Sequence, residues 1–179
     1  MLATVALRPH LIFGPGDNHL APTILNRARA GRLLRVGDGK NLSDFTFIDD
    51  CIDAHLCALK ALESGGEVGG RAYFISQSDP VPLWGWIDTL LELNGAPPVA
   101  RAVSKRSALA IAGVMEIVSK LFGTQPLFTR FLICEMTTHH YFDISAARDQ
   151  LGFQPKYGVI EALRATYKEG PKEGLRSCG

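Results

Sequence analysis

The sequence feature that most constrains the fold is an apolar run near the N-terminus that passes directly into a glycine-containing loop. Residues 4–17 read TVALRPHLIFGPGD, and the run is bounded by Pro9 and by Gly14-Pro15-Gly16. A run without polar alternation is typical of a strand in a parallel sheet, because such a strand is covered on both faces. Parallel strands are joined by crossovers. Because the chain begins on this strand, we expect a preceding segment to supply its other neighbours.

The rest of the chain alternates between predicted strands and helices, which is the pattern of an α/β protein. Residues 72–76 are apolar, and we expect them to form a strand beside the first one. Residues 44–48 alternate as a short strand does, and residues 35–39 indicate a turn. Further helices are predicted over residues 22–30, 83–93, 104–122, 129–136, 143–152 and 159–167.

A longer helix is predicted to begin just after residue 48. Its apolar positions repeat at helical spacing: Ile52, Leu56, Leu59 and Leu62. We expect Asp49 or Asp50 to cap this helix. Together with Asp53, these carboxylates complement the positive end of the helix dipole, which explains the acidic cluster without a metal ion.

Other potential metal ligands also have simpler interpretations. His139 and His140 are adjacent, so their side chains point apart on an extended segment, and no third ligand lies at a suitable spacing. The cysteines share no metal-ligand spacing: Cys51, Cys57, Cys134 and Cys178. With no secretory signal at the N-terminus, reduced thiols in the cytoplasm are expected. The formal net charge of +1 and the scattered basic residues give no reason to expect nucleic acid.

Four segments together resemble the extended short-chain dehydrogenases. They are residues 7–20 (LRPHLIFGPGDNHL), 37–62, 69–84 and 141–155 (YFDISAARDQLGFQP). Within that superfamily of NAD-dependent epimerases and dehydratases, the chain is most similar to the 3β-hydroxysteroid and sterol-4-carboxylate dehydrogenase branch. The resemblance implies the C-terminal portion of a Rossmann-type, doubly wound parallel sheet over residues 1–78. A mainly helical substrate-binding region would follow over residues 79–170, with a flexible tail over 171–179.

The catalytic signatures of that family lie outside this sequence. The family uses a Tyr-x-x-x-Lys pair and a glycine-rich dinucleotide loop, but none of the four tyrosines is followed four positions later by lysine. The glycine pairs at residues 14/16 and 37/39 lack a third glycine and are interpreted as turns. The resemblance implies hydride transfer between NAD or NADP and a secondary alcohol or ketone, with no catalytic residue in this chain. We expect the 179 residues alone to lack dehydrogenase activity.

The resemblance also implies binding roles for particular residues. The loop after the first strand would run past the nicotinamide and hold its carboxamide through backbone groups: Pro9, His10, Leu11 and Ile12. The next loop would line the substrate mouth: Gly16, Asp17, Asn18 and His19. The alternatives are a tight strand exit without a ligand and, for Asp17, a turn cap.

The expected substrate is hydrophobic, either a sterol or a long-chain 3-oxo acid. Phe45, Phe47 and the apolar segment 104–122 suit such a molecule better than a sugar nucleotide, for which only Arg35 and Arg130 are candidate diphosphate ligands. Charged residues interrupt segment 104–122, so it falls short of a membrane span. It is expected to cover the substrate pocket or pack on a partner, with weak contact to a membrane surface as the alternative.

Three functions are consistent with the sequence. The first is the C-terminal part of a hydroxysteroid or sterol-carboxylate dehydrogenase. The second is a reductase of long 2-alkyl-3-oxo acids, which shares these motifs. The third is a truncated, non-catalytic module that pairs its sheet edge and apolar helix with a partner or with itself. The sequence leaves open the choice between NAD and NADP, the start of the polypeptide and the existence of a homodimer.

Overall fold

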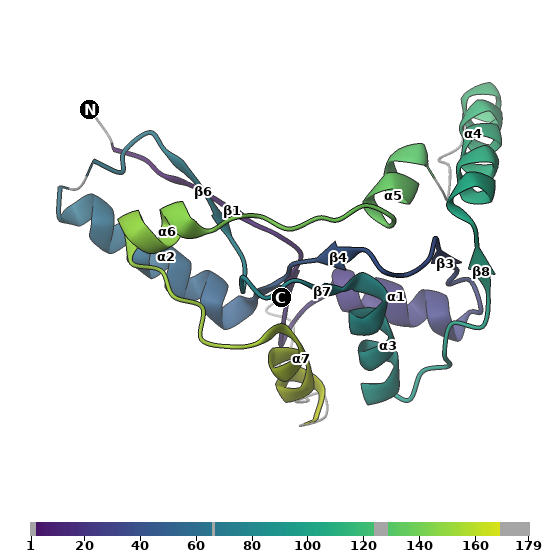
Figure 1. The fold of residues 1–179 in the computed structure, drawn as a ribbon, viewed down its shortest axis with the longest axis horizontal. Coiled ribbons are helices and arrows are strands. Elements are labelled where there is room, and N and C mark those ends of the chain that lie inside the picture. The colour runs from purple at the N-terminus through teal and green to yellow at the C-terminus, as the bar shows by residue number, and fades with distance from the viewer. Residues whose placement is uncertain (1–2, 66, 124–128, 169–179) are drawn as a thin grey trace, which may run out of the picture.

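A computed structural model describes residues 3–65, 67–123 and 129–168 of the chain (Figure 1). Its strands are β1 (Ala6–Pro9), β2 (Ile12–Phe13), β3 (Arg35–Val36), β4 (Leu42–Ser43), β5 (Thr46–Phe47), β6 (Ala72–Ile75), β7 (Val81–Pro82) and β8 (Ala102–Val103). Its helices are α1 (Leu20–Arg29), α2 (Ile48–Glu63), α3 (Leu83–Leu93), α4 (Lys105–Phe122), α5 (Arg130–Glu135), α6 (Ser145–Leu151) and α7 (Val159–Lys168).

The central pairing joins β1 to β6 in parallel, with Ala6 opposite Ala72 and Pro9 opposite Ile75. Helix α2 lies between these strands in the chain, so the crossover has the form required for parallel neighbours. Strand β2 continues from β1 and pairs in parallel with β5. The α/β class is therefore confirmed, and the two apolar segments predicted to be neighbours do lie side by side.

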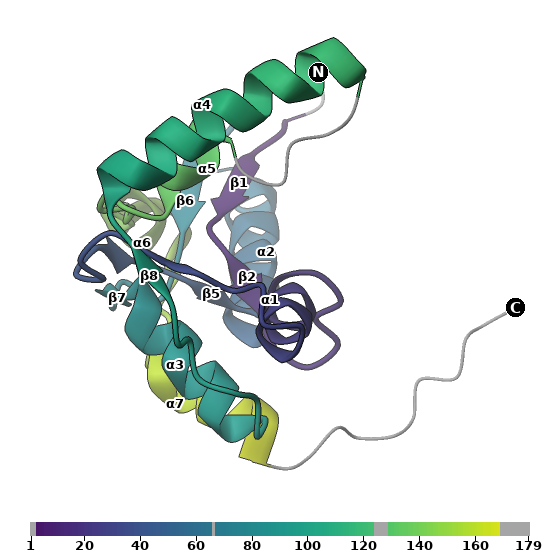
Figure 2. The same cartoon turned by 90° about the vertical axis from the view of Figure 1, so that its right-hand side faces the viewer.

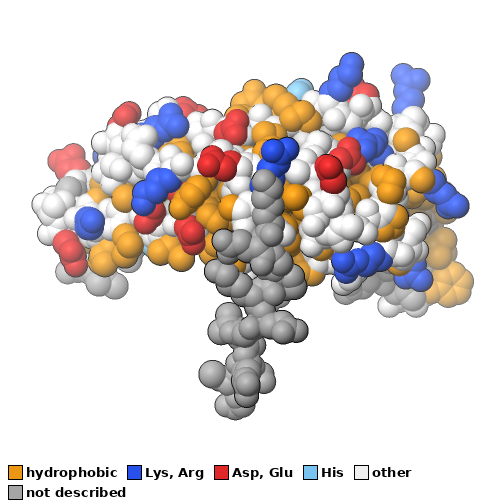
Figure 3. Space-filling model, turned by 90° about the horizontal axis from the view of Figure 1, so that it is seen from below, with side chains coloured by type: hydrophobic (Ala, Val, Ile, Leu, Met, Phe, Trp, Pro, Cys, Tyr) orange, Lys and Arg blue, Asp and Glu red, His pale blue; other side chains and the backbone are white. Residues whose placement is uncertain are grey.

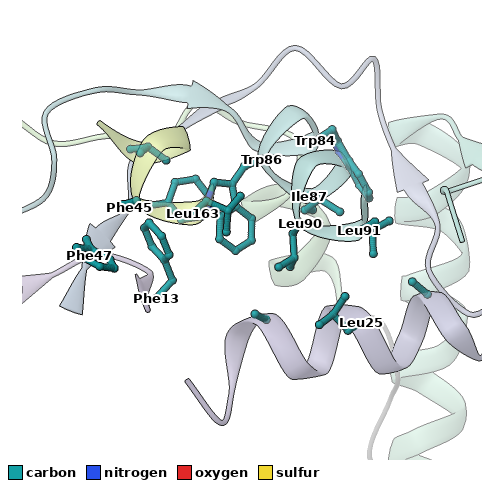
Figure 4. Close-up of a cluster of buried hydrophobic side chains, with 14 residues drawn as sticks. Phe13, Leu25, Phe45, Phe47, Trp84, Trp86, Ile87, Leu90, Leu91 and Leu163 are labelled. Atoms are coloured by element: carbon teal, nitrogen blue, oxygen red, sulfur yellow. The ribbon is translucent and has the colours of Figure 1, made fainter. Parts of the chain in front are cut away.

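Three groups of buried side chains hold the elements together. One group lies between α2, α6 and the inner face of β6, with Tyr73, Ile75 and Phe153 at its centre. A larger group joins β2 and β5 to helices α1, α3 and α7, and Figure 4 shows the rings of Phe13, Phe45 and Trp86 meeting within it. The third, smaller group joins β3 to α4 and α5.

The predicted turn over residues 35–39 is only partly correct. Arg35 and Val36 form strand β3, which pairs in parallel with β8, a strand that the sequence did not predict. The turn itself begins at Gly37, which has a φ of 79°. A strand of two residues has too little sequence pattern to be recognised. The partner of β3 also lies more than sixty residues away in the sequence, so no local signal predicts the pairing.

Helix α2 presents its small residues, and not its largest apolar ones, to the sheet. Its buried residues are Asp50, Cys51, Ala54 and Ala58, and the large apolar residues Ile52, Leu56 and Leu59 are each about half exposed. Small side chains allow the helix to approach the sheet closely. The helix also lacks a side-chain cap, because its N-cap residue is Phe47. The predicted cap by Asp49 or Asp50 is therefore wrong.

Asp50 instead connects three segments inside the protein. Its side chain is fully buried, and its carboxylate accepts hydrogen bonds from Nε2 of Gln77 at 2.6 Å and from the backbone N–H of Lys156 at 3.0 Å. Oε1 of Gln77 accepts the N–H of Phe47 at 2.9 Å. Asp50 thus ties the start of α2 to the segment after β6 and to the loop before α7.

Packing crosses the predicted domain division at residue 78 in both directions. Helix α1 precedes that boundary and packs against α3, whereas α6 follows it and packs against α2 and β6. Figure 2 shows α1, α3 and α7 gathered below the strands and α4 lying across the opposite end. The division stays a prediction. On the face drawn in Figure 3, acidic and basic side chains are interspersed, in keeping with the small net charge.

Replacing Asp50 with alanine is expected to lower the free energy of unfolding by about 2–4 kcal/mol, because the buried Gln77 amide and the part-buried N–H of Lys156 lose their acceptor. Asp49→Ala is the matched control, since Asp49 is exposed in the same helical turn. It should change stability by less than about 1 kcal/mol. Urea denaturation followed by circular dichroism measures both values. Equal effects of the two substitutions would contradict the proposed role of Asp50 in connecting the three segments.

Candidate functional site

The segment from Pro9 to Ile12 turns sharply as it leaves β1. Leu11 has a φ of 42°, a conformation that costs free energy for a residue other than glycine and that is concentrated at functional sites. The Leu11 carbonyl accepts the N–H of Thr46 at 3.3 Å. The Leu11 N–H has no hydrogen-bond partner among the described residues. The turn therefore offers one unpaired backbone donor at the C-terminal end of β1.

The Thr46 hydroxyl holds this turn in place. It lies 3.1 Å from the N–H of His10, which donates to it, and within 2.9 Å of the carbonyl oxygens of His10 and Ile75. One buried hydroxyl thus connects the ends of β1 and β6, which a β-branched apolar residue could not do. Thr46 was not predicted as a functional residue. The only signal for it was a polar residue inside an otherwise apolar strand.

His10 forms a close pair with Asp44. Nδ1 of His10 lies 2.6 Å from Oδ1 of Asp44, and the Asp44 side chain is fully buried. Oδ2 of Asp44 accepts the N–H of Phe142 at 2.9 Å. The ring of His10 also meets the Phe142 ring edge-on, with centroids 5.2 Å apart. The pair fixes the orientation of the His10 ring. Asp44 was not predicted as a functional residue.

A pocket of about 260 Å³ opens beside this turn and is lined by residues 12–19 and Ile48. Five of the predicted site residues lie on its wall: Ile12, Gly16, Asp17, Asn18 and His19. Gly14 is required at its base, because a Cβ there would collide with the side chain of Ile48. The structure thus brings the end of the predicted cofactor segment and the predicted substrate loop together around one hollow.

The Asp17 carboxylate is already occupied by the chain itself. It accepts the backbone N–H groups of His19 at 2.8 Å, Leu20 at 3.0 Å and Ala21 at 2.8 Å. These donors form the N-terminus of α1, which otherwise has no side-chain cap. Asp17 therefore holds the pocket wall against α1, which agrees with the alternative of a cap.

Phe45 and Phe47 lie in the hydrophobic core instead of at the pocket. They are 0% and 5% exposed, and the Phe45 ring stacks on Trp86 with centroids 4.5 Å apart (Figure 4). The two residues are two positions apart and so point to the same side of the segment, where both join the same buried cluster. This burial argues against direct contact with a substrate.

The two arginines that could bind a diphosphate are both paired with carboxylates. The Arg35 guanidinium lies 2.7 Å from Asp88 and stacks over the Trp84 ring at 5.1 Å. Arg130 donates to Glu116 through Nε and through its backbone N–H. These two hydrogen bonds hold the pKa of the Glu116 carboxyl below its ordinary value, and the bond from the backbone N–H has the larger effect.

Two further properties concern only the described residues. Within residues 3–65, 67–123 and 129–168, no three histidine, cysteine or acidic side chains are arranged to hold a metal ion. Over the same ranges, every helix is too short or too polar to cross a membrane.

Comparison with known proteins gives consistent matches along the chain. The sequence model of the 3-beta hydroxysteroid dehydrogenase/isomerase family matches residues 1–104. A 2-alkyl-3-oxoalkanoate reductase from Stenotrophomonas maltophilia is 44% identical over 91% of this chain and 50% of its own length. A mouse sterol-4-alpha-carboxylate 3-dehydrogenase, decarboxylating, is 32% identical over 91% of this chain and 46% of its own length. The chain thus spans about half the length of these relatives.

Among solved structures, a UDP-glucuronic acid 4-epimerase from Bacillus cereus in complex with NAD superposes with a TM-score of 0.58. The alignment covers 92% of this chain and 43% of the epimerase, at 21% sequence identity. At that identity the likeness concerns the fold alone. The likeness agrees with a Rossmann-type α/β fold.

Replacing Asp17 with alanine is expected to lower the free energy of unfolding by about 1–2 kcal/mol, because three N–H groups at the start of α1 lose their acceptor. Asn18→Ala is the neighbouring control and should remain within about 0.5 kcal/mol of the parent. Thermal unfolding of the two variants measures the difference. An unchanged midpoint for Asp17→Ala would show that the cap does not stabilise α1.

Proposed function

Because this chain belongs to the 3-beta hydroxysteroid dehydrogenase/isomerase family, we propose that it forms the substrate-binding part of an NAD- or NADP-dependent oxidoreductase. The reaction transfers a hydride between the nicotinamide and a secondary alcohol or ketone of a hydrophobic acid. The observation that carries the proposal is the strained turn at residues 9–12, in which the N–H of Leu11 has no partner among the described residues and the next residue, Ile12, lines a pocket.

The position of this turn suits a dinucleotide. In open α/β sheets, ligands bind in the crevice outside the carboxyl ends of the strands. The Pro9–Ile12 segment lies at the carboxyl end of β1, and the Leu11 N–H is the kind of donor that a carboxamide oxygen needs. When bound, the cofactor supplies the hydride chemistry. This chain's residues orient the nicotinamide and close one side of the substrate pocket.

A hydrophobic acid suits the site better than a sugar nucleotide. Arg35 and Arg130 are neutralised by Asp88 and Glu116, so neither guanidinium is available for a diphosphate without breaking an ion pair. The two relatives described above are named for substrates that carry a carboxylate close to the reacting carbon. The greater identity to the 2-alkyl-3-oxoalkanoate reductase favours an acyclic acid, and a sterol-4-carboxylate is the alternative.

The proton-transferring pair and the pyrophosphate loop are expected on another segment of the same polypeptide. Two surfaces of this chain are suited to receive it. Among the described residues, β1 pairs only with β6, so its other edge is open. Helix α2 also exposes Ile52, Leu56 and Leu59 along one face. A non-catalytic module that binds a separate partner through these surfaces is the competing interpretation.

The full-length polypeptide that contains this chain is expected to oxidise a 2-alkyl-3-hydroxy acid with NAD or NADP, whereas the isolated 179 residues should show no turnover. The hydroxy acid is preferred as substrate because 3-oxo acids lose carbon dioxide spontaneously. A parallel assay with a sterol-4-carboxylate tests the alternative substrate. Absence of turnover with both acids would contradict the proposed function and favour the binding module.

We also propose that α4 contacts a membrane surface. At about 100° per residue, its side chains fall into three sectors. Ala108, Ala112 and Ser119 are buried against the protein, and the charged residues occupy one flank. The remaining sector is apolar and exposed: Ile111, Val114, Ile117, Val118, Leu121 and Phe122.

The charge around this apolar sector favours an anionic lipid surface. Lys105, Arg106 and Lys120 lie on the flank of α4, and the helix's one acid, Glu116, is paired with Arg130. Phe131, on the adjoining α5, is 74% exposed and enlarges the apolar surface. An amphipathic helix with basic residues beside an apolar face lies in the membrane interface without crossing it.

The protein is expected to sediment with vesicles rich in anionic lipid and to bind neutral vesicles less strongly. Val114→Glu combined with Leu121→Glu should weaken the partitioning by about tenfold or more, because apolar side chains no longer enter the lipid. Ala146→Glu, an exposed residue on α6, is the control for added negative charge. Equal binding by the parent and the double variant would contradict the membrane contact.

A further inference from the structure

His10 carries the only side chain with polar atoms on the segment from Pro9 to Ile12. Its two ring nitrogens have different surroundings. Nδ1 is held by Asp44 at 2.6 Å. Nε2 has no hydrogen-bond partner among the described residues and is not among the buried polar atoms that lack one. The side chain is 19% exposed, so a ligand can reach this nitrogen without moving the ring.

Asp44 determines which nitrogen carries a proton. An ionised carboxylate only accepts hydrogen bonds, so the nitrogen facing Asp44 must be the donor. The Asp44 carboxylate also receives the N–H of Phe142 at 2.9 Å, which fixes its position. The Asp44 side chain is completely buried, so the His10 ring is the side chain that complements it. A His10 ring that carries both protons donates to Asp44 through Nδ1 and keeps its Nε2–H for a ligand.

The rings around His10 restrict its movement. Phe142 meets it edge-on, and the ring of His140 lies with its centroid 5.5 Å away. Arg8 lies two positions earlier on β1 and therefore on the same face. Its guanidinium lies over the Phe74 ring at 5.8 Å, and no described acid pairs with it. Arg8 thus adds a positive charge to the face of β1 that bears His10.

The substrate class proposed above requires a cation at this place. In a 3-hydroxy or 3-oxo acid, one carbon separates the carboxylate from the carbon that exchanges hydride. The group that binds the carboxylate must therefore lie on a segment adjoining the nicotinamide. A charged group in an apolar cleft needs a charge-assisted hydrogen bond. His10 is on that segment, whereas Arg35 and Arg130 lie outside it.

We propose that His10, oriented by Asp44, binds the substrate carboxylate through its Nε2–H and thereby selects acids over neutral alcohols. This inference rests on the proposed function and assigns the acid specificity of the site to a single side chain. By holding the carboxylate, His10 would also set the position of the reacting carbon against the nicotinamide. Asp44 acts through His10 and is a positioning residue.

The test compares a 2-alkyl-3-hydroxy acid with its methyl ester as substrates of the full-length enzyme. The parent should prefer the acid. His10→Gln should lower kcat/KM for the acid by about 10- to 100-fold, mainly through KM, because a charge-assisted hydrogen bond is lost. Turnover of the ester should change less than about twofold. His55→Gln is the matched control, since His55 bonds only to the Cys51 carbonyl within α2.

Each outcome separates this inference from the proposed function. An equal loss on acid and ester, or no loss on either, would overturn the role of His10 while leaving the oxidoreductase intact. Failure of the parent enzyme to oxidise either substrate would overturn both proposals. If His10→Gln does not fold, the test uses the parent enzyme alone. Equal kcat/KM values of the parent for the acid and its methyl ester would then overturn the proposal. His10→Arg, which keeps a cation beside Asp44, should restore part of the preference for the acid.

Discussion

The structure depends on a small set of buried hydrogen bonds where β1 and β6 end. Apolar burial drives the sheet and its helices together, but it is not directional and would tolerate more than one register. The Thr46 hydroxyl contacts backbone groups of both strands, and Gln77 links the end of β6 to Phe47 and Asp50. Each of these groups would be costly to bury without its partner. The polar contacts therefore favour one arrangement, in which the turn after β1 faces the pocket.

Elements whose ends are determined by residues close in the sequence were predicted well. Helix α4 has a Ser104 cap that accepts the N–H of Ser107, and it ends at Gly123 in a left-handed conformation. Both signals are local, and the helix was predicted within one residue at each end. The pairing of β1 with β6 was also predicted, because two apolar runs separated by a helical segment have few other arrangements available.

The site was only partly predictable, because its key contacts join residues that are distant in sequence. The loop around Asp17 was recognised from its motif, but Asp44 becomes meaningful only when His10 lies beside it, thirty-four residues away. The buried face of α2 is not evident from its apolar repeat for a related reason. Large apolar residues at helical spacing normally mark the core, yet Ala54 and Ala58 pack on the sheet and Leu56 faces outward.

The outward-facing residues of α2 help to interpret this chain as part of a larger sheet. An open edge on β1 and a half-exposed apolar face on α2 are unfavourable in an isolated α/β protein, because both promote association. They become favourable if further strands and helices continue the sheet beyond β1. The apolar sector of α4 is different, since basic side chains adjoin it and α4 packs mainly on α5. One exposed surface therefore suits protein, whereas the other suits lipid. An enzyme for a hydrophobic acid would gain from both surfaces. Its substrate concentrates at the membrane–water interface, where the carboxylate stays in water and the alkyl part enters the lipid.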